Sequence, residues 1–263
     1  MKIFYGINNE EQSLLVPRFL IAYERIKSKD RSKFYIPNKE WLLDSSEFTL
    51  AARGQTFEDQ KNYEKYWSPQ AYAQFINEWN PTWAFTQDSA FYSKTKRVWT
   101  KNEIKMKHQI TNDKTGQIMD YLDDKNKVAN VIQGITKEDF LDHVDMMKES
   151  DTLTEFLGIG SIFFNPDFIN IITDIKKSVP AHIKLHGLGV KKINIKKHPA
   201  LIHKLYSIDT AVWFSIGKYT TPSNSRNSFL YLFVQDMENF IKQIEDNSYI
   251  DEFEIDEDDE DVK

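Results

Sequence analysis

The sequence has 263 residues, of which 40% are hydrophobic and 28% are charged, and it contains no cysteine. The lack of cysteine excludes disulfides and thiolate metal sites, and it indicates a reducing cytoplasm as the setting. No apolar run approaches the roughly 20 residues that a membrane helix needs. The first residues also lack the basic and then apolar layout of a signal peptide. We therefore expect a soluble cytoplasmic protein without membrane contact.

The formal net charge of −6 is unevenly distributed along the chain. Residues 251–263 hold nine acidic residues and one lysine, so the preceding 250 residues carry a net charge of +2. A single α/β barrel takes roughly 250 residues. We therefore expect one domain over residues 1–248 and an acidic, disordered tail over residues 249–263.

Short β-like runs alternate with longer helical stretches. In chain order, the pattern predicts a strand at 2–7, a helix at 14–27, strands at 41–43 and 83–86 with a helix at 72–79 between them, and a helix at 101–122. It then predicts strands at 128–132, 156–162, 182–185 and 205–208, alternating with helices at 136–149, 166–177 and 199–204. Residues 229–234 form either an eighth strand or the beginning of a final helix that runs to about residue 245.

This alternation is typical of βαβ units and a parallel sheet. An open doubly wound sheet and a TIM-type (β/α)8 barrel both fit it. The barrel is favoured because polar residues directly follow apolar strands, and in a parallel barrel the carboxyl ends of all strands meet on the face that holds the active site. These residues are Asp44, Asp88, Gln133, His186 and Asp209.

A carboxylate at this face can act as a nucleophile, a general base or a hydrogen-bond acceptor. The simpler alternative for any single aspartate is a helix N-cap. The joint occurrence of three such aspartates with Gln133 and His186 favours an active site. The other histidines have no metal-ligand spacing, and no phosphate loop, His-Glu-x-x-His or Gly-x-Ser-x-Gly motif is present. We expect neither a metal nor a cofactor.

Basic clusters in the body of the chain are candidates for contact with a phosphate backbone, particularly where aromatic residues are interleaved. The alternative is ordinary solvated surface. The first cluster contains Lys94, Lys96, Arg97, Lys101, Lys105 and Lys107 with Tyr92 and Trp99, and the second contains Lys191, Lys192, Lys196 and Lys197.

Five segments resemble, in matching order, the motifs of the tRNA-guanine transglycosylase superfamily. Residues 43–48 resemble its Asp-Ser-Gly-Gly-aromatic motif, residues 131–134 its Val-Gln-Gly segment, and residues 158–161 its glycine-rich base-binding turn. Residues 186–190 resemble the strand and loop before the nucleophile, and residues 206–213 the nucleophile segment itself. The last form, with the Gly-x-Gly-Ser turn, is more similar to the branch that inserts 7-deazaguanines into DNA, which is often phage-encoded.

The resemblance implies the same fold, TIM-type (β/α)8, and a role for each matching residue. Asp209 would be the nucleophile at C1′ of the target guanosine, and Asp44 the general acid/base. Asp88 would accept hydrogen bonds from the purine N1–H and exocyclic amine. Gln133 and the backbone of Gly158 to Gly160 would read the O6 side, and Phe48 and His186 would sandwich the base. Ser45 would be a further substrate-binding residue. Two carboxylates also suit displacement at an anomeric carbon, and an aromatic side chain suits a flat purine.

The chain departs from the family pattern at two points. Ser46 and Glu47 occupy the positions of the family's glycine pair, which puts the shape of that loop in doubt. The zinc site of bacterial and archaeal tRNA enzymes, made of three cysteines and a histidine, is missing because the chain has no cysteine. This second departure favours DNA over tRNA as the substrate.

We therefore expect a transglycosylase that exchanges guanine in DNA for a 7-deazaguanine derivative through a covalent Asp–sugar intermediate, in the cytoplasm of a bacterial host. Its partners would be DNA, from which the target base must leave the stack, and the free 7-deazaguanine base; a homodimer stays open. The alternatives are a tRNA-guanine transglycosylase, a deazapurine-releasing nucleoside hydrolase or lyase, and a non-catalytic binding subunit of a transglycosylase complex.

Overall fold

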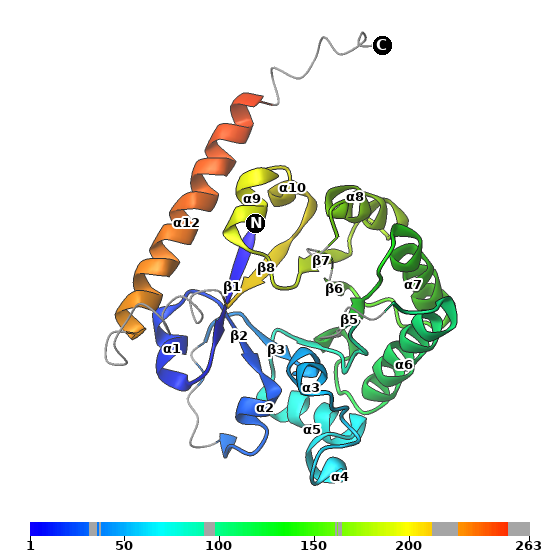
Figure 1. Ribbon diagram of the computed structural model, residues 1–263. Coiled ribbons are helices and arrows are strands. Elements are labelled where there is room, and N and C mark those ends of the chain that lie inside the picture. The colour runs from blue at the N-terminus through cyan, green and yellow to red at the C-terminus, as the bar shows by residue number, and fades with distance from the viewer. Residues whose placement is uncertain are drawn as a thin grey trace, which may run out of the picture.

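The computed structural model describes residues 1–31, 36, 38–91, 98–160, 162, 165–211 and 226–251. Its eight parallel strands close into a barrel in chain order, because β1 pairs with β2 on one side and with β8 on the other. The helices lie around the outside of this barrel (Figure 1). The TIM-type (β/α)8 barrel is therefore confirmed, and the open doubly wound sheet is wrong.

The strands are short, and because they are parallel their carboxyl ends lie on the same face of the barrel. They are β1 (Lys2–Ile7), β2 (Phe19–Ala22), β3 (Trp41–Asp44), β4 (Trp83–Phe85), β5 (Val128–Ile132), β6 (Phe156–Ile159), β7 (Lys184–Gly187) and β8 (Ser207–Thr210).

The helices vary from single turns to long rods. They are α1 (Glu10–Leu15), α2 (Tyr23–Ile26), α3 (Glu47–Arg53), α4 (Tyr63–Tyr66), α5 (Pro69–Trp79), α6 (Lys101–Asp120), α7 (Lys137–Glu149), α8 (Phe168–Ser178), α9 (Lys192–Lys197), α10 (Leu201–Lys204) and α12 (Arg226–Asp251). The expected cap of α7 is present, since Thr136 and Asp139 each accept a hydrogen bond from the other's backbone N–H.

One sequence prediction is wrong, and the alternative left open for residues 229–234 is decided in favour of the final helix. The segment 14–27 is not one helix, because β2 lies inside it between α1 and α2. Phe19 and Ile21 are buried and alternate with half-buried residues, and the Phe19 ring stacks on Trp41 of β3 with centroids 5.7 Å apart. The eighth strand is therefore Phe19–Ala22, whereas residues 229–234 belong to α12.

Alternate residues of the strands fill the inside of the barrel. A compact cluster there consists of Phe4, Leu42, Phe85, Ala129, Val131 and Phe156. Their neighbours in sequence, such as Ile3 and Leu43, belong to a second, larger cluster that packs the outside of the strands against the helices. The barrel interior is thus a packed apolar plug, on which polar side chains at the carboxyl ends of the strands rest.

The helix α12 runs along the outside of the barrel near α1 and β1 (Figure 1). Its buried side chains recur at helical spacing, and Glu238 accepts hydrogen bonds from Arg18 at 3.0 Å and from Tyr5 at 3.1 Å. The helix extends to Asp251, beyond the expected start of the tail at residue 249, and the rest of that tail lies outside the described residues. No helix in the described part of the chain is apolar over a length sufficient to cross a bilayer.

Candidate active site

The alternation of side chains places the polar residues of several strands above the apolar plug. Asp44 ends β3 two residues after Leu42, and Gln133 follows β5 two residues after Val131, so both share the inward face of their strands. Asp209 of β8 lies opposite Phe4 in the parallel register. The sequence prediction that strand ends bring these side chains to one face is therefore confirmed.

Asp209 is held by one of its two carboxylate oxygens. Its Oδ1 accepts a hydrogen bond of 2.8 Å from the backbone N–H of Gly189 and lies 3.2 Å from Nε2 of His186. Gly189 has φ of +72°, a conformation that favours glycine, and this turn aims its N–H at the carboxylate. Within the described residues Oδ2 has no donor, and the side chain is 12% exposed. One oxygen of Asp209 is thus oriented and open.

The imidazole ring of His186 contacts Asp209 through Nε2 and Ser207 through Nδ1. Its Nδ1 lies 2.9 Å from the hydroxyl of Ser207. Because a carboxylate only accepts hydrogen bonds, the neutral ring carries its proton on Nε2, and Ser207 donates to Nδ1.

The ring is fully buried, with the centroids of Phe4, Phe85 and Phe156 at 6.1, 5.1 and 5.6 Å. Stacking on a base requires an open ring face, and His186 has none. Its contacts instead indicate that it orients Asp209.

Asp44 is the carboxyl group whose ionisation falls nearest neutrality. Its Oδ1 accepts a hydrogen bond of 3.2 Å from the backbone N–H of Ser46. Burial raises the pKa of Asp44 to about 7, the Ser46 bond opposes this shift, and the negative charges of Asp209 and Asp88 add to it. The charges of both other aspartates therefore act on the carboxyl group of Asp44.

Asp88 and Gln133 form a hydrogen-bonded pair at the buried side of the site. Gln133 Nε2 donates to Oδ2 of Asp88, and the hydroxyl of Ser45 donates to Oδ1 at 3.5 Å. Burial raises the pKa of Asp88, and the bond from Gln133 counteracts part of this shift. Oε1 of Gln133 is buried without a partner among the described residues. An unpaired buried acceptor is costly, so this pair is suited to a ligand that presents several donors and acceptors.

A side chain at either glycine of the turn would displace a neighbouring side chain of the site. A Cβ at Gly160 would lie 2.6 Å from Gln133 Nε2, and a Cβ at Gly158 would lie 2.9 Å from the ring of Phe85. Both distances are too short for a real side chain. The lack of a side chain at these glycines leaves the space that Gln133 and Phe85 occupy. Ser161, the last residue of the same motif, lies outside the described residues.

The loop after β3 keeps a glycine-like shape without glycine. Ser46 has φ of +74°, and its hydroxyl accepts a hydrogen bond of 3.0 Å from the backbone N–H of Glu24. The side chain of the next residue, Glu47, turns inward and is buried, while Phe48 is 55% exposed. Phe48 is therefore on the surface of the protein and does not form a two-sided base sandwich with the buried His186.

Three site residues were missed by sequence reasoning. Ser207 is two residues before Asp209 on the same strand, so the two-residue alternation was a usable signal for it. Gly189 lies in the motif segment 186–190, and its N–H contact with Asp209 depends on tertiary structure. Glu47 stands at a departure from the family motif, and that departure was its only signal.

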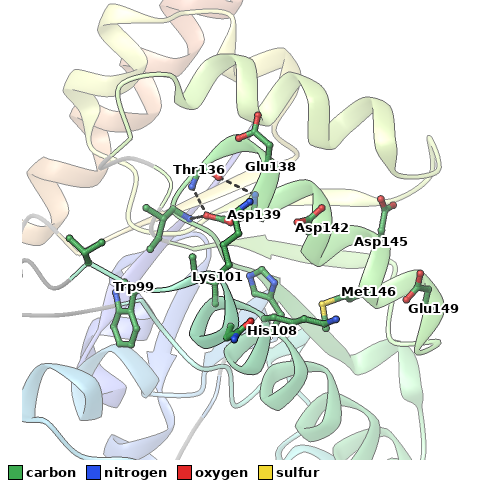
Figure 2. Close-up of a pocket in the computed structure, with 15 residues that line it drawn as sticks. Trp99, Lys101, His108, Thr136, Glu138, Asp139, Asp142, Asp145, Met146 and Glu149 are labelled. Carbon is green, nitrogen blue, oxygen red and sulfur yellow. Dashed lines mark hydrogen bonds between the residues drawn. The ribbon is translucent and has the colours of Figure 1, made fainter.

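A groove of about 1000 Å³ lies between α6 and α7 (Figure 2). One wall carries Lys101 and His108, and the other is the acidic face of α7. None of Asp44, Asp88 and Asp209 lines it. The acidic wall is Glu138, Asp139, Asp142, Asp145 and Glu149.

The lysines proposed for phosphate contact are partly engaged within the protein. Lys107 donates to Ser89 Oγ and Ala90 O at 3.0 and 2.9 Å, and Lys192 pairs with Asp236 at 2.6 Å. Residues 92–97 of the first cluster lie outside the described residues. Nucleic-acid binding by these clusters stays a prediction.

The described residues contain no group of three histidine or acidic side chains arranged to hold a metal ion. The site contains the oriented carboxyl group of Asp209 and the carboxyl group of Asp44, whose pKa is raised to about 7. Beside them lies the hydrogen-bonded pair of Asp88 and Gln133. Comparison of the sequence with protein-family models gives no match, and comparison with curated proteins gives none either.

Proposed function

We propose that this protein is a nucleic-acid guanine transglycosylase that exchanges guanine in DNA for a 7-deazaguanine derivative. The observation that carries the proposal is the pair of Asp209 and Asp44 at the mouth of the barrel. Asp209 has an oriented carboxylate with a free oxygen, and Asp44 has a pKa raised to about 7. Two carboxyl groups with different roles are what a displacement with retention at an anomeric carbon needs.

In the first half-reaction, Oδ2 of Asp209 attacks C1′ of the target nucleotide. The C1′–N9 bond breaks, and its electron pair goes to the purine, which receives a proton from the acid form of Asp44. The product is a covalent ester between Asp209 and the sugar. A general acid with a pKa near the working pH can both give up and regain its proton.

In the second half-reaction, the ionised Asp44 takes the proton from the ring nitrogen of the incoming 7-deazaguanine. That nitrogen attacks C1′, and the bond between C1′ and Asp209 breaks to restore the free carboxylate. Protons and charge therefore balance over the cycle, which consumes no cofactor.

The base would be recognised by Asp88, Gln133 and the backbone beside Gly160. Asp88 would accept hydrogen bonds from the purine N1–H and exocyclic amine, since a carboxylate offers acceptors only. In the free protein Gln133 Nε2 donates to Asp88, so purine binding would free this N–H to donate to O6. The exposed ring of Phe48 would cover the base.

DNA is proposed over tRNA because the nucleophile segment and the glycine turn have the forms of the DNA-modifying branch, and because the zinc cysteines of the tRNA enzymes are missing. The target nucleotide would leave the base stack to reach the barrel mouth, which is the general route of enzymes that act on bases.

The test is base exchange with a labelled 7-deazaguanine, offered duplex DNA and bulk tRNA in parallel. We expect label in DNA with the wild type and with Asp236→Asn, a surface carboxylate control on α12, and none with Asp209→Ala. Without incoming base, the wild type should also form a denaturation-resistant adduct with DNA that Asp209→Ala does not form.

The other outcomes contradict parts of the proposal. Label in tRNA alone would keep the chemistry and replace the substrate. Release of free base without any polymer would indicate a nucleoside hydrolase. If the folded wild type gives no label in either polymer and no adduct, the protein is not a transglycosylase by itself, and a non-catalytic subunit becomes the better account.

A further inference from the structure

Beside Asp88 lies a second buried carboxyl group that the proposed reaction does not use. Glu47, at the first position of α3, has its side chain turned inward and 9% exposed. Its Oε1 accepts a hydrogen bond of 3.4 Å from the backbone N–H of Ala90. This bond ties the loop that carries Asp88 to the beginning of α3.

Ser45 connects the two acidic residues. Its hydroxyl accepts a hydrogen bond of 3.4 Å from the backbone N–H of Glu47 and donates one of 3.5 Å to Oδ1 of Asp88. Glu47 and Asp88 also line the same pocket of about 400 Å³ between α3, the segment after it and α6. The two acidic residues, 9% and 8% exposed, therefore share one small pocket.

Two buried carboxyl groups in such a space do not both carry a charge at low cost, because like charges repel strongly where water is scarce. Asp88 has a side-chain donor on each oxygen, Gln133 on one and Ser45 on the other. In the described part of the chain, the side chain of Glu47 accepts one hydrogen bond, 3.4 Å long, from the backbone N–H of Ala90. Donors stabilise the charged form, so the negative charge belongs on Asp88 and the shared proton on Glu47.

The charges around Glu47 also favour the proton on Glu47 and the negative charge on Asp88. Burial raises the pKa of Glu47 most, the charge of Asp88 raises it further, and the bond from Ala90 and the charges of Lys114 and Lys107 lower it. Lys114 is paired with Glu58 at 2.7 Å, and Lys107 donates to Ser89 and Ala90. Both lysines are thus directed at other partners. The remaining titratable groups of the pocket are Tyr63 after α3 and Asp113 on α6.

We propose that Glu47 is a positioning residue for base recognition: in its protonated form it leaves the single negative charge of the pair on Asp88 and holds the Asp88 loop, so that Asp88 stays an acceptor for the N–H groups of the purine. This inference rests on the proposed function. The motif that residues 43–48 resemble has glycine at this position, so the resemblance itself does not imply this role for Glu47.

The proton on Glu47 can be observed without any exchange reaction. Infrared difference spectroscopy at neutral pH should show the carbonyl stretch of a protonated carboxylic acid that is lost in Glu47→Gln and kept in Glu58→Gln. Glu58 is the matched control, because it lines the same pocket but is paired with Lys114 and 55% exposed at its side chain. An unchanged spectrum in Glu47→Gln overturns the proposal.

Binding of free guanine, measured by calorimetry from mildly acidic to alkaline pH, tests the consequence for Asp88. Glu47→Ala should weaken guanine binding by about tenfold, the effect of losing one bond that holds the loop. Glu47→Gln, which has the shape of the protonated acid, should restore most of this loss.

The pH profile separates positioning from a merely structural role. In the wild type, guanine affinity should fall at alkaline pH, where the second charge forces the pair apart, and in Glu47→Gln this fall should be absent. Equal profiles in the two proteins would overturn the proposal. If the wild type binds guanine and shows the acid proton but exchanges no base, the proposed function fails while this inference stands.

Discussion

His186 Nε2 lies 3.2 Å from Oδ1 of Asp209, in a ring whose other nitrogen is 2.9 Å from the hydroxyl of Ser207. These contacts link Ser207, His186 and Asp209 in a hydrogen-bonded series from the packed interior of the barrel to its mouth. The series orients the carboxylate of Asp209, the proposed nucleophile.

Replacing this ring should slow the chemical step and leave base binding intact. His186→Phe keeps the aromatic volume but removes both ring nitrogens, so Asp209 loses one of its two orienting donors. We expect kcat to fall about 10- to 100-fold, or about 1.4 to 2.7 kcal/mol, with little change in KM for the base, since Asp88 and Gln133 are untouched. Steady-state exchange kinetics would check this. An increase in KM with an unchanged kcat would contradict the orienting role.

The burial of Asp44 predicts a pH-dependent cost to stability. Its pKa in the folded state is about 7, above the ordinary 3.8. A raised folded-state pKa means that the stability from the protonated form is fully present below pH 3.8 and is lost as pH rises through about 7. Asp44→Asn should therefore stabilise the protein above neutral pH by about 2 kcal/mol, a value reduced because the group is partly exposed, and have little effect near pH 3.8. Denaturant unfolding at both pH values gives the difference. An equal gain at both would exclude titration of Asp44 as the cause.

Much of the barrel was predictable from sequence because its signals are local. Apolar runs such as Val128–Ile132 read as buried strands, and the alternation with helices fixes the class. The strand β2 was missed although Pro17 separates it from α1, because its four residues run directly into α2 at Tyr23 and their apolar spacing also fits a helix. Its identity is decided by pairing with β1 and β3, which a local pattern does not contain.

The site was predictable to a similar depth. Asp44, Gln133 and Asp209 could be predicted as site residues from their position at strand ends, because the carboxyl ends of parallel strands lie on one face of the barrel. The burial of His186 was not predictable, since its ring faces are covered by aromatic residues from three other strands. The inward turn of Glu47 likewise depends on the left-handed backbone of Ser46 before it.

A methyl group at Gly160 should impair base binding specifically. Its Cβ would lie 2.6 Å from Gln133 Nε2, so Gln133 must move and its bond to Asp88 is lost. We expect Gly160→Ala to weaken guanine binding by about tenfold or more, the value of one or more hydrogen bonds to a charged group. Gly116→Ala is the control: it lies within α6 with its nearest atom at 3.9 Å, and should stabilise the helix by about 1 kcal/mol without changing affinity. Calorimetric titration with guanine compares the two. Equal affinities in both variants would show that Gln133 does not contact the base.

The left-handed conformation of Ser46 predicts an order of stability between two small substitutions. Both Ser46→Gly and Ser46→Ala lose the hydrogen bond from the Glu24 N–H to the hydroxyl. Alanine keeps the strain of φ +74°, which costs an L-residue roughly 1–2 kcal/mol, whereas glycine removes the strain and loses part of this gain through the greater freedom of its unfolded chain. Ser46→Gly should therefore be more stable than Ser46→Ala by about 1 kcal/mol, measured as the difference between their urea unfolding free energies. If alanine were as stable as glycine, the loop would not need the left-handed residue that directs Glu47 inward and places the Ser46 N–H on Asp44.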